Sequence, residues 1–316
     1  MILTTPPPTT RLTKLSVSAP AKLNLVLKVL GRRSDGFHDV ESLVVAIDHC
    51  DEVSVRASPG GQRVLCCNDA QLPQDRDNFV WRAAEALAGR TADSGSLGWD
   101  IELTKRIAVG AGMGGGSSDA ATTLFALNEL WQTGLSLDEL AELGATIGSD
   151  VPLFFAQPSC VIRGRGERVE RTRLNWSGWV TLICPGIFVA TKDVYAAWRP
   201  DDRGADTGSA TARVAAARSA RDLGPAMANE LESAIARVAP RVEEMHRAVS
   251  ALGSAPVRVS GAGSTLFALF DTFDEATALA RAVTTELGGL QTYVVRTLTD
   301  SLMRAPTANG VRSGNC

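Results

Sequence analysis

The sequence has 316 residues, 45% of them hydrophobic and 21% charged, and its 32 basic and 35 acidic side chains give a formal net charge of −3. This composition is ordinary for a folded globular protein, and the interleaved charges argue against a surface built to bind nucleic acid or anionic lipid. The length favours two domains over one.

Cysteine, histidine and the apolar segments indicate a cytoplasmic protein. The six cysteines are scattered without a C-x-x-C pair, as expected of reduced thiols, and the three histidines lie far apart without a zinc-ligand pattern. The N-terminal stretch MILTTPPPTTRLT lacks the apolar core of a signal peptide. No apolar run approaches the roughly 20 residues that span a bilayer.

The first third of the chain is predicted to be rich in strands. Residues 15–31 alternate apolar and polar side chains, which predicts a strand, a break at Pro20 and a second strand. A turn around Asp35-Gly36 leads to residues 44–58, which are typical of strand, turn and strand. Helical spacing follows over 78–90, with Asp77 as a possible cap, and a strand over 98–109.

The remainder alternates between helical and extended patterns. A glycine-rich loop leads into an apolar helix over 111–131, and Ser136 with Glu139 forms a capping-box signature for a second helix to about Ile147. Strands are expected from Cys160 to Val189 and a surface excursion over 199–222. Helices near 226–238 and 240–252 precede strand 257–260, loop 261–264, strand 265–270, helix 274–288 and strand 292–298. This order predicts two α+β layers.

The glycine-rich segment AVGAGMGGGSSDAA, residues 108–121, is the sharpest local signal. Glycines let backbone N–H groups approach a ligand closely, and the following helix start adds unpaired donors and a positive dipole end. Ser117 and Ser118 are candidates to cap that helix and to offer hydroxyls to phosphate or Mg²⁺. The geometry favours a phosphate ligand.

Three other interpretations of this segment fit less well. Gly110, Gly112 and Gly115 satisfy G-x-G-x-x-G, but the dinucleotide fold requires a strand after the helix, and a second helix is predicted there. The Walker A form is absent because no lysine follows the glycines. A flexible linker would not normally lie tightly between a strand and an apolar helix.

Two further segments carry candidate reactive groups, each with a structural alternative. Lys22 and Asn24 point to the same face if PAKLNL is a strand, although an isolated lysine there often extends to solvent. Asp150 precedes Val151-Pro152 and would make an ordinary helix cap. A capping aspartate can also serve as a base if its free oxygen faces a cavity.

Four segments in the same order, PAKLNL, the glycine loop running into SSDAA, GSDVP and SGAGST, resemble the GHMP kinase superfamily over about residues 19–265. The longer matches PAKLNLVLKVLGRRSDGFHDVESL, GMGGGSSDAA and GSDVPLFF are similar to the branch that phosphorylates the 2-hydroxyl of a cytidine-diphosphate-linked methylerythritol in the non-mevalonate (MEP) isoprenoid pathway. The resemblance implies an α/β (α+β) fold of two lobes. An ATP-binding lobe like ribosomal protein S5 domain 2 would span 1–161 and a ferredoxin-like lobe 162–303, with a loose tail over 304–316 and a last strand near 293–300 that can return to the first lobe.

The resemblance also assigns roles at the nucleotide end. Asp150 would be the catalytic base, and Lys22 would stabilise the transferring phosphoryl group beside it. Lys105, Asp77 and Asn78 would lie near the adenosine. The ATP phosphates would be held by Ala108, Val109, Gly110, Ala111, Gly112, Met113, Gly114, Gly115, Gly116, Ser117 and Ser118.

At the acceptor end, His38 matches a histidine that binds the cytosine edge, and Phe37 and Tyr195 match two stacking aromatics, with Asn24 beside the acceptor. Phe37 could instead be a buried turn anchor. Residues 261–264, Gly-Ala-Gly-Ser, would form a backbone nest for the acceptor's diphosphate, in which Gly261, Ala262 and Gly263 contact substrate, or would be a tight turn between strands.

Some residues depart from the superfamily pattern. Ala108 replaces a common proline, Met113 a common leucine, and the charge of Asp119 would repel ATP if it pointed inward. We expect ATP and Mg²⁺ to be required, with the metal held by ATP and water rather than by a dedicated protein ligand, and a monomer or weak homodimer.

Two other functions stay open on the resemblance. One is a GHMP kinase for another alcohol, of the homoserine or mevalonate type, although those acceptors have no base to stack on Phe37 and Tyr195. The other is a non-catalytic sensor that binds ATP or sugar, although a pure binder does not need both Lys22 and Asp150.

Overall fold

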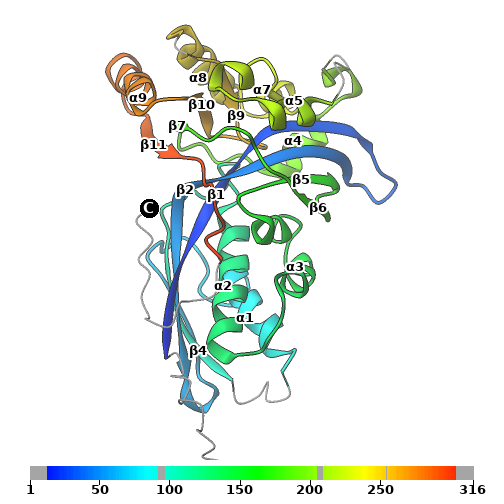
Figure 1. The fold of residues 1–316 in the computed structure, drawn as a ribbon, viewed down its shortest axis with the longest axis vertical. Helices are drawn as coiled ribbons and strands as arrows, with labels where there is room; N and C mark the ends of the chain where they lie inside the picture. Colours follow the sequence, from blue (N-terminus) through cyan, green and yellow to red (C-terminus); the bar gives the residue numbers. More distant parts are fainter. Residues whose placement is uncertain (1–12, 92–96, 205–208, 254, 304–316) are drawn as a thin grey trace, which may run out of the picture.

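The computed structural model describes residues 13–91, 97–204, 209–253 and 255–303. Two long antiparallel strands, β1 (Lys14–Arg32) and β2 (His38–Ser58), run obliquely through the molecule and connect its two halves (Figure 1). The predicted breaks at Pro20 and within 44–58 are wrong, because both stretches are continuous strands. The register jumps from Pro20 opposite Cys50 to Ala21 opposite Ile47, so a bulge in β2 absorbs the irregularity that proline imposes.

The first sheet has the order β3–β4–β2–β1–β8, and β5 and β6 extend from β2. The length of β2 allows it to pair with β1 along one edge and with β4 and then β5 along the other. The other bounds are β3 Arg63–Cys67, β4 Gly98–Thr104, β5 Ser159–Gly164, β6 Arg168–Arg171 and β8 Ala228–Asn229, with a 3₁₀ turn at Pro59–Gly61.

Helices α1 (Phe79–Ala88), α2 (Gly115–Trp131) and α3 (Leu137–Ala145) cover this sheet together with a 3₁₀ segment, Pro152–Ala156 (Figure 1). The core between them includes the fully buried Trp99, Leu124 and Phe154. The capping box of Ser136 and Glu139 is confirmed at the start of α3. The cap of α1 is Asn78, whose side chain accepts from the Val80 N–H at 2.9 Å, and not Asp77.

Helix α2 begins differently from the prediction. Its N-cap is Gly114, with φ +72°, and no side chain of the described residues caps it, so the proposed capping by Ser117 or Ser118 is wrong. Both serines lie within the first turn, because the helix already begins after Gly114, whose lack of a Cβ suits its left-handed conformation. The succession of α2 and α3 without an intervening strand agrees with the rejection of a dinucleotide fold.

The second half is built on an antiparallel sheet in the order β11–β7–β10–β9. Its strands are β7 Trp179–Cys184, β9 Val257–Val259, β10 Leu266–Phe270 and β11 Gln291–Arg296. Helices α8 (Pro240–Ala251) and α9 (Phe273–Leu287) lie at the end of the molecule that is far from α1 (Figure 1). The smaller elements are α4 Thr191–Ala197, a 3₁₀ turn Pro200–Asp202, α5 Ala210–Ala216, α6 Ala220–Leu223 and α7 Glu232–Val238.

The two halves interlock through the chain. Strand β8 pairs in parallel with Val26 and Leu27 of β1, so the helix expected from about 226 begins only at Glu232. After β11, Thr297 bridges to Ile47 of β2, and Met303 is buried in the core of the first half. Within the described chain no helix is long and apolar enough to cross a membrane.

Candidate active site

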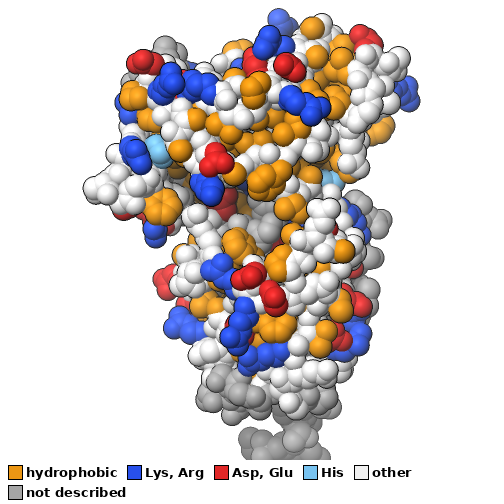
Figure 2. Space-filling view, turned by 180° about the vertical axis from the view of Figure 1, so that it is seen from behind, with side chains coloured by type: hydrophobic (Ala, Val, Ile, Leu, Met, Phe, Trp, Pro, Cys, Tyr) orange, Lys and Arg blue, Asp and Glu red, His pale blue; other side chains and the backbone are white. Residues whose placement is uncertain are grey.

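A cavity of about 830 Å³ opens between the two halves of the molecule, where Figure 2 shows the surface hollowed. Its walls come from β1, the β1–β2 turn, the glycine loop with the first turn of α2, the segment before the 3₁₀ turn at Pro152, α4 and the loop after β9. Segments that are up to 240 residues apart, from Lys22 to Ala262, therefore meet in one place.

Lys22 lies in the middle of β1 and only 5% of its surface is exposed, so the alternative of a solvent-facing lysine is wrong. Its ammonium donates to Asn24 Oδ1 at 2.5 Å and to the Gly112 carbonyl oxygen at 2.6 Å. Burial lowers the pKa of Lys22, and the Asp150 carboxylate acts in the opposite direction. The cation is thus fixed to the glycine loop.

Asp150 lines the same cavity as Lys22 and lies in the turn between α3 and Pro152. The interpretation of Asp150 as a helix cap is wrong, because among the described residues no side chain caps the Pro152–Ala156 segment, whose first residue follows Val151. The carboxylate acts electrostatically on the far wall as well. Burial raises the pKa of the Tyr195 hydroxyl, and the negative charge of Asp150 raises it further.

The backbone of the glycine loop is turned so that its carbonyl oxygens face the protein. All four carbonyls from residue 111 to residue 114 accept hydrogen bonds from protein donors. Since N–H and C=O of one peptide point in opposite directions, this leaves N–H groups for a ligand, together with the unpaired first turn of α2. The donors are Thr265 N to Ala111 (3.2 Å), Lys22 Nζ (2.6 Å) and Ser260 Oγ (3.0 Å) to Gly112, Lys22 N to Met113 (3.0 Å) and Ser118 N to Gly114 (2.9 Å).

Close packing explains two of the loop glycines. A Cβ on Gly112, at φ +80°, would lie 2.0 Å from the Ser260 carbonyl oxygen of the second half. A Cβ on Gly110, at φ +66°, would lie 2.4 Å from the ring of Phe188. The backbone contact leaves no room for a side chain at Gly112, whereas at Gly110 the largely exposed Phe188 ring would have to move aside.

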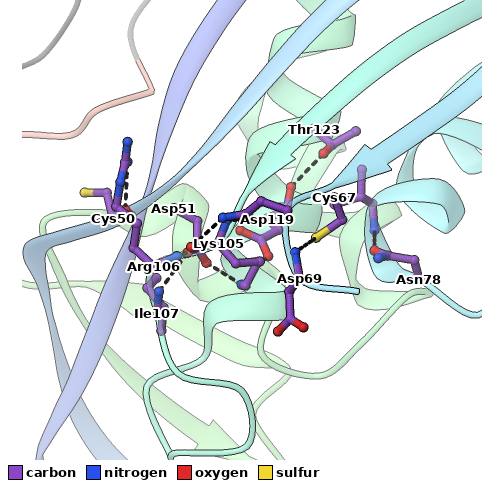
Figure 3. A network of polar contacts seen from close by, with 12 residues as sticks. Cys50, Asp51, Cys67, Asp69, Asn78, Lys105, Arg106, Ile107, Asp119 and Thr123 are labelled. Atoms are coloured by element: carbon purple, nitrogen blue, oxygen red, sulfur yellow. Dashed lines mark hydrogen bonds and ion pairs between the residues drawn. The ribbon is translucent and has the colours of Figure 1, made fainter. Parts of the chain in front are cut away.

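A buried cluster of charges joins both ends of this loop (Figure 3). Lys105 binds the carboxylate of Asp51 and lies 2.7 Å from Asp119 Oδ2. Asp51, which is fully buried on β2, also accepts from the N–H groups of Arg106 and Ile107 at 2.5 and 2.8 Å. Asp119 thus pairs with a cation instead of facing the cavity as a lone charge.

The charge of this cluster is unbalanced, since one cation meets two carboxylates. Burial, together with the negative charge of Asp51, raises the pKa of Asp119 to about 8. The Lys105 cation acts in the opposite direction and lowers it. The two carboxylates raise the pKa of Lys105 in spite of its burial. Lys105 is therefore charged, and the raised pKa of Asp119 favours the protonated form of this carboxyl.

Aromatic groups gather at the other end of the cavity. Phe37 is 53% exposed at the tip of the β1–β2 turn, so the alternative of a buried anchor is wrong, and the Arg165 guanidinium lies 5.5 Å from its ring centre. The ring centres of His38 and Tyr195 are 5.2 Å apart. Burial and the nearby Arg32 both lower the pKa of His38, which keeps its imidazole neutral at pH 7.

Comparison with known proteins agrees with this architecture. The models of the GHMP kinases N terminal domain and the GHMP kinases C terminal domain match residues 78–157 and 212–289. The 4-diphosphocytidyl-2-C-methyl-D-erythritol kinase of Pelobacter propionicus is 35% identical over 285 residues, covering 90% of this chain and 99% of its own length. That of Geobacter metallireducens is 39% identical over 272 residues, covering 85% and 94%.

The chain belongs to the 4-diphosphocytidyl-2-C-methyl-D-erythritol kinase family. A crystal structure of 4-(cytidine 5'-diphospho)-2C-methyl-D-erythritol kinase, 34% identical, matches with a TM-score of 0.76 over 90% of this chain and 99% of its own. Homoserine kinase from Cytophaga hutchinsonii is 19% identical with a TM-score of 0.71, and this likeness shows the fold alone. The predicted two-lobed GHMP kinase fold is confirmed.

Most residues that the sequence singled out for a 4-diphosphocytidyl-2-C-methyl-D-erythritol kinase line the cavity. Three do not line it in the described chain: Met113 and Ser118 are buried in the protein, and Gly263 faces the side chains of Val259 and Ile235. The residues that line it are Lys22, Asn24, Phe37, His38, Asp77, Asn78, Lys105, Ala108, Val109, Gly110, Ala111, Gly112, Gly114, Gly115, Gly116, Ser117, Asp150, Tyr195, Gly261 and Ala262.

The sequence did not reveal several polar groups of the site. Arg32, Arg165 and Lys192 add positive charge to the cavity walls, and Asp51 accepts hydrogen bonds from the backbone just before the glycine loop. Lys192 was visible as one of only five lysines, in the same segment as Tyr195. Arg165 gave no signal, because an arginine between two glycines on a strand connection is typical of an exposed turn.

Proposed function

We propose that this protein is an ATP-dependent kinase that phosphorylates the 2-hydroxyl of 4-diphosphocytidyl-2-C-methyl-D-erythritol, an intermediate of the MEP route to isoprenoids. The observation that carries the proposal is the convergence of Lys22 and Asp150 beside the glycine loop in one cavity. Relatives named for this activity share 35–39% identity along nearly the whole chain.

Asp150 and Lys22 perform the chemistry at the acceptor. The carboxylate of Asp150 takes the proton of the 2-hydroxyl as its oxygen attacks the γ-phosphorus of ATP. The bond from that phosphorus to the β–γ bridging oxygen breaks, and ADP leaves. Phosphoryl transfer depends on alignment and charge neutralisation more than on covalent help, so the Lys22 ammonium at the attacking oxygen and the γ-phosphoryl group supplies the main electrostatic contribution.

The glycine loop holds the phosphates of ATP. Its free N–H groups and the first turn of α2 form an anion site, and Lys105 with its two carboxylates keeps both ends of the loop in place. Asp77 and Asn78 line the cavity beyond the loop, where the adenosine would lie. Because the Lys105 cation is already paired twice, its contribution to ATP is positional rather than a free charge.

The cytidine of the acceptor binds between the β1–β2 turn and α4. Exposed Phe37 and the ring of Tyr195 offer stacking faces, and neutral His38 can hydrogen-bond the cytosine edge. Stacking on an aromatic ring contributes about 1–3 kcal/mol per base. Gly261 and Ala262 line the cavity near Lys22 and Asn24, and their backbone is placed for the diphosphate.

Magnesium enters this scheme bound to ATP. Within the described residues no cluster of three or more His, Cys, Asp or Glu side chains could hold a metal ion. Mg²⁺ commonly keeps several waters and is bound through substrate phosphates, so the protein needs to supply few ligands. We expect calorimetry to show Mg²⁺ binding in the presence of ATP and none in its absence.

The domain division, the location and the assembly follow the same proposal. An ATP-binding domain would comprise residues 1–161, with the last strand near 293–300 returning toward it, and a second domain 162–303; the tail expected over 304–316 lies outside the described residues. We propose a cytoplasmic enzyme that acts as a monomer or weak homodimer on a small-molecule substrate, without nucleic acid or membrane.

An acceptor panel tests the function. The purified protein is assayed for ADP release with ATP, Mg²⁺ and one alcohol at a time: the cytidine-linked substrate, homoserine or mevalonate. We expect turnover with the first alone. Preference for an alcohol without cytidine would replace the proposed substrate by that of another GHMP kinase. ATP binding without turnover of any alcohol would favour a non-catalytic sensor.

A further inference from the structure

Behind the catalytic lysine lies a chain of three buried polar contacts. Lys22 Nζ donates to Asn24 Oδ1 at 2.5 Å, Asn24 Nδ2 donates to Ser42 Oγ at 2.8 Å, and Ser42 Oγ donates to the Val26 carbonyl oxygen at 2.5 Å. Ser42 is completely buried on β2, and Asn24 is 6% exposed on β1. The chain leads from the cavity into the sheet.

The direction of each hydrogen bond is fixed by chemistry. The Val26 carbonyl can only accept, so the Ser42 hydroxyl must donate its one proton there. The lone pairs of Ser42 then face Asn24 and can bind only its NH₂ group. The amide is thereby oriented with Oδ1 toward the Lys22 ammonium, which has no acceptor of its own. Without the Ser42 hydroxyl the NH₂ group of Asn24 would lose its acceptor, and the amide would be oriented at its Lys22 end alone.

This orientation matters because Lys22 is buried and depends on acceptors to stay charged. Its two protein acceptors are Asn24 Oδ1 and the Gly112 carbonyl. A flipped amide would place the NH₂ of Asn24 against the ammonium and replace an attraction by a repulsion. Burial lowers the pKa of Lys22 and the Asp150 carboxylate raises it, so the loss of one acceptor would shift the balance toward a lower pKa.

We propose that Ser42 is a positioning residue that locks the Asn24 amide and so holds the Lys22 ammonium in its charged, oriented form. This inference rests on the proposed function only for the role of Lys22 in turnover. The hydrogen-bond lock itself is a property of the free protein.

A purely structural role for Ser42 is the competing explanation. The register of β1 and β2 shifts between Asn24 and Val26, and the Ser42 hydroxyl binds a carbonyl freed at that irregularity. If this were its whole purpose, loss of the hydroxyl would change stability and leave the acid–base behaviour of Lys22 as it was.

A matched pair of variants separates the two explanations. Ser42→Ala removes the lock, and Ser159→Ala removes another buried serine, 4% exposed on β5, that donates to the Thr172 carbonyl at 2.7 Å, outside the chain of contacts. The primary readout is the pKa of the Lys22 amine, followed by NMR of ¹³Cε-labelled lysine. The chain has only five lysines, so a Lys22→Arg variant identifies the signal.

We expect Ser42→Ala to lower the pKa of Lys22 and Ser159→Ala to leave it in place. In the kinase assay, Ser42→Ala should reduce kcat about tenfold, the size of one hydrogen bond to a charged group, with the alkaline limb of its pH profile shifted to lower pH and the KM for ATP unchanged. Ser42→Thr, which keeps the hydroxyl, should recover most of the rate.

Equal Lys22 pKa values in Ser42→Ala and the unaltered protein would overturn the inference. Should Ser42→Ala not fold, Ser42→Cys keeps the volume and weakens both hydrogen bonds, and the same pKa comparison decides. Since the NMR measurement needs no acceptor, its result stands whether or not the acceptor panel supports the proposed substrate.

Discussion

At the scale of single residues, Asp150 is the base that we propose for the proton transfer. Its carboxylate lines the cavity and caps no helix, so it is available as a base. We expect Asp150→Asn to reduce kcat by about 10²–10⁴, the usual contribution of a general base, and to leave the affinity for ATP nearly unchanged. Steady-state kinetics and calorimetry with ATP measure the two effects.

A control for this prediction is Asp100→Asn. Asp100 lies on β4, pairs with Arg56 near the surface and does not belong to the cavity lining. Its removal should leave kcat unchanged. Full turnover by Asp150→Asn would show that another group accepts the proton.

His38 should give the acceptor affinity a pH dependence at the acidic side. Burial and Arg32 lower the pKa of its imidazole below the ordinary histidine value, so the neutral ring predominates at pH 7. Protonation removes the ring's acceptor and adds a charge beside Arg32. We expect the KM for the cytidine-linked acceptor to rise as the pH falls below about 6, the ordinary range of histidine, while the KM for ATP stays flat.

His38→Ala should raise the KM for the acceptor at pH 7 and abolish this acid dependence. The measurement is a series of KM values for both substrates across pH in the two proteins. An unchanged pH dependence in His38→Ala would assign the titration to another group.

At the scale of elements, the glycine loop depends on close contact with the second half of the molecule. A Cβ on Gly112 would meet the Ser260 carbonyl at 2.0 Å, in addition to the strain of φ +80°. Gly134, between α2 and α3, has a similar φ of +73° with nothing within 4 Å. Gly134→Ala therefore measures the backbone strain alone, about 1–2 kcal/mol.

We expect Gly112→Ala to lose at least about tenfold in ATP affinity, because the alanine displaces the loop that presents its N–H groups, a contribution worth one or more hydrogen bonds. Gly134→Ala should lower the melting temperature slightly and bind ATP normally. Calorimetric titration of both variants decides. Equal ATP affinities would mean that the loop adapts without loss.

The cluster of Asp51, Lys105 and Asp119 joins β2, the loop after β4 and α2, and it should make stability depend on pH. The folded-state pKa of Asp119 is raised to about 8, well above that of an unfolded carboxyl, so the folded state binds the extra proton between these limits. The stabilisation is complete below about pH 4, the unfolded pKa, and is lost as the pH rises through the folded value.

We therefore expect the free energy of unfolding to fall between about pH 4 and pH 8, and Asp119→Asn to flatten this slope, since Lys105 keeps Asp51 as its partner. Urea unfolding at a series of pH values measures both proteins. The same slope in the variant would contradict the assignment to Asp119.

Elements with a local signal were predictable from the sequence. The periodicity of α1 and α9 and the capping box of α3 lie within a few neighbouring residues, and the structure confirms them. The long strand β2 was not predictable as one strand, because the polar residues Asp48 and His49 resemble a turn. They form a bulge, which becomes evident only from the pairing of β2 with β1. The two-residue strand β8 has no pattern of its own.

In the candidate site too, residues in local motifs were predictable and residues placed by long-range contacts were not. Lys22, Asp150 and the glycine loop lie in contiguous motifs, so their types and spacing indicated phosphate chemistry. Asp51 is separated from Lys105 by 54 positions and acts through a contact that no spacing encodes. Arg165 reaches Phe37 only because β5 pairs with β2.

At the scale of the whole molecule, the end of the described chain contributes to the first half. Met303 is 4% exposed in the core that contains Trp99 and Leu124. We expect Met303→Ala to cost about 2–3 kcal/mol of stability, in the range for deletion of a buried methionine side chain. Met303→Leu, which conserves volume, should cost less than about 1.5 kcal/mol.

Urea unfolding of the two Met303 variants measures the difference. Met303 lies beyond β11. A large loss of stability in Met303→Ala, but not in Met303→Leu, would show that the chain must return to the core of the first half for full stability. No difference between alanine and leucine would mean that this anchor is not needed.

The pairing of β8 with β1 limits how such molecules can be recombined. Consider a fusion that joins the second half of a relative to this first half. It would replace β8, the edge strand that pairs with β1, and β1 contains Lys22. The donor would also bring its own contact to the Gly112 carbonyl in place of Ser260. Hybrid enzymes of this architecture should therefore inherit altered catalysis even when every motif of the first half is retained.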